Sequence, residues 1–305
     1  MFTGPSLDVT YAVTATFPEA NVGARSRYFA LRHLEKMSQR AVGTYPQVAC
    51  LAFDVISNSI AVDGRFEREE LEALAKHVFP RLNGTEVCLD IGANIGNHSL
   101  FFARHFREVH AFEPHPRIYP LLDYNAALAD NVTTYPFGCS SEEGTFTAAA
   151  VSGNIGMTSV GREGGETKVE LQLKRLDEVP AIKALSRIDF VKIDVEGHEA
   201  EAFEGARETL QAHRPVVALE ILAPEISEGT SRSIQTLKSI GYKHFYALRS
   251  HRPFASAPKP LAKAATALAG LLFDKRPEKS FTLEPVEKLD VRNHPLVIAS
   301  VTPLI

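Results

Sequence analysis

A stretch at residues 87–100, VCLDIGANIGNHSL, combines an acid and glycines at a spacing that suits a cofactor site. An apolar run ends in Asp90, then passes Gly92 and Gly96 before a helical pattern begins. This order predicts a buried parallel strand, a tight turn, and a helix whose first free N–H groups face a crevice. Ligands of parallel-sheet proteins bind at such strand-to-helix junctions. A plain strand-to-helix turn without a ligand is the alternative.

Position 94 bears on the kind of cofactor. A dinucleotide-binding loop of the form GxGxxG needs a second glycine so that the diphosphate can contact the backbone, and Asn94 stands in that place. A side chain there is easier to accommodate beside a cofactor that lacks phosphates and carries an amino-acid part. The loop therefore favours S-adenosylmethionine over NAD.

A second apolar strand, EVHAFEP at 108–114, ends in Glu113. It follows the first glycine by about 20 residues, the spacing at which an acid reaches ribose hydroxyls. We expect Asp90 to engage the methionine amino group and Glu113 to hold the ribose, with Ser140, in the turn after the third strand, near the adenine. The predicted cofactor-binding residues are Asp90, Gly92, Asn94, Gly96, Glu113 and Ser140.

A third acidic run, VKIDVEGHE at 191–199, could supply the reacting groups. Lys192 and Asp194 share one face of a strand because they are two residues apart, and a buried lysine is costly unless it is paired. Its expected partners are Asp194 and Glu220, which closes the next strand. Such a cluster can orient an acceptor and hold a base near neutral pKa. A structural ion-pair network is the alternative.

His198 follows at a helix entrance and titrates near neutral pH. We expect Asp194 and Glu196 to shape the acceptor site and His198 to assist as a base. Glu196 and Glu199 could instead act as favourable acids at a helix N-terminus. The predicted catalytic residues are Lys192, Asp194, Glu196, His198 and Glu220.

A metal-assisted reaction is a less favoured alternative. Asp194, Glu196 and Glu220 offer the oxygen ligands that Mg²⁺ prefers. We expect no resident metal, and activity that is lost on chelation and restored by Mg²⁺ would reverse that expectation.

DIGANIG at 90–96, AFEP at 111–114 and above all VKIDVEGHEAEAFEGA at 191–206 resemble the FkbM family of class I S-adenosylmethionine-dependent methyltransferases. The resemblance runs from about residue 60 to about residue 250. It implies methyl transfer to a hydroxyl, commonly of a sugar or a secondary metabolite. Methylation of a nitrogen or a carboxylate is the nearest alternative, while a nucleotide-dependent oxidoreductase and a non-catalytic module are less favoured.

Strand and helix patterns alternate along the chain, which predicts an α/β protein with a mostly parallel sheet. The resemblance implies a Rossmann-like sheet of seven strands, the last antiparallel. The strands are expected at 87–90, 108–113, 133–137, 190–194, 216–221, 244–248 and 295–301. A hairpin of 144–151 with 168–173 is expected to carry a glycine-rich loop that serves as a lid, with a disordered turn as the alternative.

Two further regions flank this core. Residues 1–82 are expected to form an N-terminal cap with helices at 26–40 and 65–79 and a hairpin at 48–62, ahead of a methyltransferase domain at 83–305. Residues 249–293, between the last two strands, are expected to form an acceptor-side insertion. Its apolar segment 260–273 is expected to be a lid helix, then a dimer contact, then a membrane-surface helix, in that order of preference.

Composition limits the partners. The 305 residues carry a net charge of only −4, so no general basic field attracts nucleic acid. The three cysteines lack metal-ligand spacing, and no run approaches the roughly 20 apolar residues of a membrane span. We expect a cytoplasmic enzyme with a small-molecule or glycan acceptor, and a homodimer stays open.

Overall fold

The computed structural model describes residues 23–52, 54–151, 154–160, 167–251 and 279–305. The chain divides into two compact units, 1–44 and 45–305, so the boundary lies well before the expected position 82. The first unit contains α1 (Ala24–Ala41), a helix where its periodicity predicts one. Residues 45–82 belong instead to the unit that contains the sheet.

The hairpin expected at 48–62 is wrong, because Val55–Asp63 form helix α2. The side chain of Asp54 accepts a hydrogen bond from the backbone N–H of Ile56, and Gly64 ends the helix in the left-handed conformation (φ 79°). These two signals, an N-cap acid and a terminal glycine, override the apolar alternation between them.

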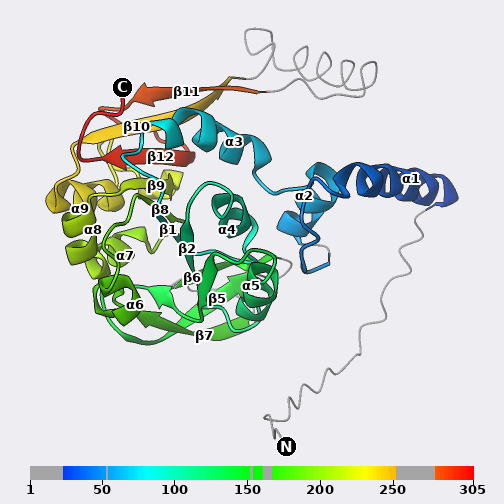
Figure 1. Ribbon diagram of the computed structural model, residues 1–305, viewed down its shortest axis with the longest axis horizontal. Helices are drawn as coiled ribbons and strands as arrows, with labels where there is room; N and C mark the ends of the chain where they lie inside the picture. Colours follow the sequence, from blue (N-terminus) through cyan, green and yellow to red (C-terminus); the bar gives the residue numbers. More distant parts are fainter. Residues whose placement is uncertain (1–22, 53, 152–153, 161–166, 252–278) are drawn as a thin grey trace, which may run out of the picture. The chain divides into compact units, whose positions relative to one another are not determined.

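The main sheet has eight strands among the described residues, in the order β11-β10-β12-β9-β8-β1-β2-β3 (Figure 1). Their bounds are β1 Val87–Ile91, β2 Glu108–Phe112, β3 Val132–Tyr135, β8 Phe190–Ile193, β9 Val216–Ile221, β10 His244–His251, β11 Ser280–Pro285 and β12 His294–Ser300. Five strands run parallel to one another, namely β1, β2, β3, β8 and β9. Strand β12 is antiparallel to both β9 and β10. The expected mostly parallel sheet with an antiparallel last strand is confirmed.

One strand exceeds the expected seven. β11 comes from the insertion before the last strand and pairs antiparallel with β10 at the sheet edge. The apolar segment at 260–273, together with its expected role as a lid, lies outside the described residues.

A smaller sheet has the order β4-β7-β5-β6. Its strands are β4 Gly138–Cys139, β5 Gly144–Val151, β6 Asn154–Val160 and β7 Thr167–Lys174. The expected pairing of 144–151 with 168–173 is confirmed as β5 with β7. The glycine-rich segment is not all loop, because β6 pairs with β5.

Helices cover both faces of the main sheet (Figure 1). Leu71 of α3 and Phe102 of α4 pack on the face formed by Cys88, Phe190 and Ala218. Helices α7, α8 and α9 pack on the opposite face. The helices are α3 Arg68–His77, α4 Asn97–Phe102, α5 Tyr119–Ala126, α6 Pro180–Lys183, α7 Glu199–Gly205, α8 Arg207–His213 and α9 Arg232–Ile240, with short 3₁₀ turns at Phe79–Arg81, Leu176–Glu178 and Ala223–Glu225. No helix within the described ranges is long and apolar enough to span a membrane.

Candidate active site

Asp90, the penultimate residue of strand β1, carries a fully buried carboxyl group. Its Oδ2 accepts a hydrogen bond of 2.6 Å from the Ser99 hydroxyl of α4. Its Oδ1 is buried and has no hydrogen-bond partner among the described residues. A buried carboxyl oxygen without a hydrogen-bond donor is costly, so this atom can receive a donor from a ligand.

The loop after β1 depends on glycine for a reason that the sequence did not reveal. Gly92 has a φ of 82°, and a Cβ there would lie 1.9 Å from the backbone carbonyl oxygen of Asp194. A side chain at position 92 is therefore excluded by close packing against the chain after β8, and not only by the close approach of a ligand. Asn94 also adopts a positive φ of 51°, a conformation that asparagine tolerates better than most residues.

Glu113 lies directly after strand β2, and its carboxylate is buried. It accepts hydrogen bonds from the backbone N–H groups of Asn94 (3.0 Å) and His115 (2.8 Å). Burial outweighs these hydrogen bonds and raises the pKa of Glu113 to about 7. The structure thus holds this carboxylate against the glycine loop, where it can accept further donors.

Ser140 and His198 contact each other. The Ser140 hydroxyl is 2.9 Å from His198 Nε2. This approach requires Gly205 in α7, because a Cβ there would lie 1.8 Å from the carbonyl oxygen of Ser140. Burial lowers the pKa of His198, although the charge of Glu201 opposes the shift. The structure thus places Ser140, which was predicted to lie near the adenine, beside His198, which was predicted to act as a base.

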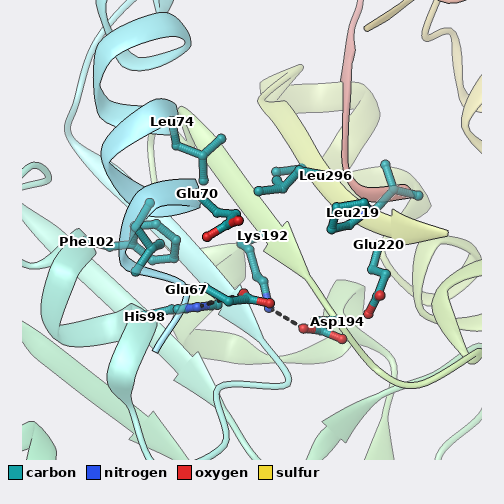
Figure 2. Close-up of a pocket in the computed structure, with 13 residues that line it drawn as sticks. Glu67, Glu70, Leu74, His98, Phe102, Lys192, Asp194, Leu219, Glu220 and Leu296 are labelled. Carbon is teal, nitrogen blue, oxygen red and sulfur yellow. Dashed lines mark hydrogen bonds and ion pairs between the residues drawn. The ribbon is translucent and has the colours of Figure 1, made fainter. Parts of the chain in front are cut away.

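Three of the remaining catalytic candidates line a pocket at the carboxyl ends of β8 and β9, and Glu196 is not among its lining residues. The space inside it, including its opening to solvent, is about 390 Å³. Lys192, Asp194 and Glu220 line it, whereas His198 does not. Figure 2 shows Lys192 reaching toward Asp194 while Leu74, Phe102 and Leu296 form apolar walls.

Lys192 and Asp194 form a direct ion pair, with 2.8 Å between Lys192 Nζ and Asp194 Oδ2. Burial alone would raise the pKa of Asp194, but the charge and hydrogen bond of Lys192 hold it below its usual value. Burial alone would lower the pKa of Lys192, but the charges of Asp194 and Asp90 raise it instead. Both groups therefore stay ionised at neutral pH, which makes Asp194 a weak base.

Glu220 has the opposite character. Burial, together with the negative charges of Asp194, Glu196 and Glu67, raises the pKa of Glu220 to about 8, although Lys192 opposes the shift. This group exchanges a proton close to neutral pH, as a general base requires.

Glu67 and His98 also line the pocket and were not predicted from the sequence. His98 Nε2 lies 3.3 Å from Glu67 Oε2, and Figure 2 shows the two side chains next to each other. Burial would raise the pKa of Glu67, but His98 and Lys192 lower it. The position of His98 in the first turn after the glycine loop is a signal that could have identified it. Glu67 has no such local signal.

Glu199 supports the loop that follows β8. Its buried carboxylate accepts hydrogen bonds from the backbone N–H groups of Val195 (3.1 Å) and Gly197 (3.3 Å). Glu196 between them adopts a positive φ of 53°, a strained conformation for this residue. Glu199 is thus the acid of the helix N-terminus that the sequence suggested, and it holds the strained loop in place.

Within the described part of the chain, no group of three or more His, Cys, Asp or Glu side chains is arranged to hold a metal ion. Cys88 and Cys139 are buried and Cys50 is exposed, all as free thiols.

The chain matches the family model of the methyltransferase FkbM domain over residues 90–244, about half of its length. It is 34% identical over 155 residues to "Methyltransferase sdnD" of Sordaria araneosa, covering 39% of this chain and 60% of that protein. It is 32% identical over 130 residues to "Hexuronic acid methyltransferase AglP" of Haloferax volcanii, covering 42% of this chain and 52% of that protein. The chain thus spans between half and three fifths of these relatives.

Solved structures of methyltransferases are similar at low sequence identity. An FkbM methyltransferase of Methylobacillus flagellatus KT is 17% identical with a TM-score of 0.36, covering 76% of this chain and 58% of that one. The O-methyltransferase of Bacillus cereus is 14% identical with a TM-score of 0.39, covering 89% of this chain and 91% of that one.

Proposed function

We propose that this chain, which belongs to the FkbM family of methyltransferases, transfers a methyl group from S-adenosylmethionine to a hydroxyl of a sugar, glycan or secondary metabolite. The observation that carries the proposal is the pocket beside the glycine loop, where the Lys192–Asp194 ion pair adjoins a carboxylate of raised pKa, Glu220. The relative named a hexuronic acid methyltransferase supports a sugar-like acceptor.

The residues at the ends of β1 and β2 fit S-adenosylmethionine. Asp90 Oδ1 is a buried oxygen that lacks a donor among the described residues, and an ammonium group would supply one. Glu113 is held by two backbone N–H groups and can accept hydroxyl protons. When bound, S-adenosylmethionine supplies an electrophilic methyl group on a sulfonium sulfur. Gly92, Asn94, Gly96 and Ser140 stay predictions as cofactor contacts.

The pocket residues remove the proton of the acceptor and orient it. Glu220 takes the hydroxyl proton as the acceptor oxygen forms its new bond. Asp194, kept ionised by Lys192, accepts a hydrogen bond from the acceptor and orients it. Orientation alone can contribute about 7–11 kcal/mol in the best intramolecular cases, so a base of moderate strength is sufficient. His198 is assigned to the Ser140 side and not to this proton.

A thermal-shift screen tests the cofactor directly. S-adenosylhomocysteine should stabilise the protein by about 2.7 kcal/mol at 100 times its Kd, whereas NAD and NADP should not shift the melting temperature. Stabilisation by a dinucleotide alone would contradict the proposal.

Cofactor affinity should depend on pH through Glu113. The ionised carboxylate accepts ribose hydroxyls, and its pKa is raised to about 7, so protonation below that value competes with binding. We expect the Kd of S-adenosylhomocysteine to rise about tenfold per pH unit below the pKa of Glu113 and to level off above it. Calorimetry across this range measures it. A Glu113→Gln protein should bind weakly without this slope, and an unchanged slope would assign it to another group.

Asp194→Asn should lower kcat about 10²-fold through loss of acceptor orientation, while the Kd of S-adenosylhomocysteine changes little. Both quantities are measured on the same purified protein. An equal loss of both would place Asp194 among the cofactor contacts.

A further inference from the structure

The pocket beside Lys192 is lined by more acids than bases. Glu67, Glu70, Asp194 and Glu220 contribute carboxylates, and Lys192 is the sole lysine or arginine among the described lining residues. Lys192 is buried and already donates to Asp194 at 2.8 Å. Its positive charge is already offset by the negative charges of Asp194, Asp90 and Glu67, so a second carboxylate would gain little attraction from it.

A neighbouring lysine, Lys279, does not offset the excess of carboxylates over cations in the pocket. Lys279 Nζ lies 2.7 Å from Glu69 Oε2 and 3.1 Å from Glu70 Oε1, so one ammonium serves two carboxylates of α3. The bidentate guanidinium that usually receives a carboxylate is missing from the described lining. A carboxylate entering the pocket would meet the ionised carboxylates of Glu67 and Asp194, whose pKa values are held low, while Glu220, with a pKa of about 8, adds negative charge only as the pH rises.

The same surroundings suit hydroxyl and ammonium groups. Carboxylates accept hydrogen bonds from both, and an ammonium adds an attraction of opposite charges that burial strengthens. Leu74, Phe102 and Leu296 supply an apolar wall against which the C–H face of a sugar ring can pack (Figure 2). The carboxylates of the pocket thus select an acceptor by its charge, and the apolar residues select it by its shape.

We infer that the acceptor is a sugar-like polyol whose end inside this pocket carries a protonated amine and no carboxylate. This inference rests on the proposed function, and it sets this chain apart from the relative that is named for hexuronic acid.

A matched series of methyl glucosides tests the inference, because its three members differ only at carbon 6. They carry an ammonium in the 6-amino-6-deoxy compound, a hydroxyl in the glucoside, and a carboxylate in the glucuronide. We expect binding to the full chain with S-adenosylhomocysteine to weaken in that order, with at least about tenfold between the extremes, measured by calorimetry near neutral pH. Methyl transfer measured by mass spectrometry should follow the same order.

Three results would overturn the inference: tightest binding of the glucuronide, equal binding of all three, or binding of none. The cofactor is titrated first. If S-adenosylhomocysteine does not bind, the proposed function fails, yet the same series without it still measures the charge preference of the pocket. The two failures are therefore distinguishable.

Two variants of similar chemistry separate pocket charge from general surface charge. Glu67→Gln removes a carboxylate that lines the pocket, so the preference for ammonium over carboxylate should shrink severalfold. Glu72→Gln removes an exposed carboxylate of α3, the helix that follows Glu67, outside the lining, so the preference should stay as it is. An unchanged ratio in the folded Glu67→Gln protein would contradict the charge-based explanation.

Discussion

In a Glu220→Gln protein, kcat for methyl transfer should fall by about 10²- to 10⁴-fold, the usual contribution of a positioned general base. The amide keeps the size of the side chain but cannot accept the hydroxyl proton. The Kd of S-adenosylhomocysteine should stay within a few fold, because Glu220 lines the pocket proposed for the acceptor.

The charges around Glu220 give this prediction a second readout. Burial raises the pKa of Glu220 to about 8, helped by the negative charges of Asp194, Glu196 and Glu67, while the positive charge of Lys192 opposes the shift. A base acts in its ionised form, so the rate should rise about tenfold per pH unit below that pKa and level off above it. In the Glu220→Gln protein this slope should disappear.

Glu225 provides the control. It lies five residues after Glu220, outside the pocket lining, and its carboxylate accepts a hydrogen bond from the backbone N–H of Leu222. A glutamine can accept the same bond, so Glu225→Gln should keep both the rate and the pH profile. A Glu220→Gln enzyme with wild-type rate and slope would transfer the role of base to another group, with His98 the next to test.

The parts of the site that sequence could predict are those that one segment determines. Asp90 and the glycine loop lie on a strand and its own turn, and the two-residue spacing of Lys192 and Asp194 is enough to bring them together. The strand order follows from regular alternation of strands and helices, because right-handed crossovers leave few arrangements. The additional strand β11 was not predicted, because no pattern in the sequence indicated it.

The missed parts depend on contacts between distant segments. Glu67 lies close enough to Lys192 for their charges to interact because α3 packs on one face of the sheet. The positive φ of 51° that Glu67 adopts could not be predicted from the sequence. His198 turns to Ser140 because Gly205 lets α7 approach that turn closely. Each of these placements is set by tertiary packing, which periodicity and spacing do not encode.

Gly92→Ala should destabilise the protein by about 3–5 kcal/mol, among the larger effects of single substitutions. Two costs add here. An alanine in the left-handed region costs about 1–2 kcal/mol, and its Cβ would lie 1.9 Å from the carbonyl oxygen of Asp194. That oxygen belongs to the backbone and cannot move aside without displacing the Asp194 side chain, so catalysis should fall as well.

Gly197→Ala separates the two costs, because Gly197 has a φ of 94° but nothing lies within 4 Å of its added Cβ. It should lose only the conformational part, about 1–2 kcal/mol, in urea unfolding measured beside Gly92→Ala. Equal losses would mean that the loop relaxes away from Asp194 and that close packing does not position the acceptor site. A clear excess in Gly92→Ala would link the glycine of the cofactor loop to the residue that orients the acceptor.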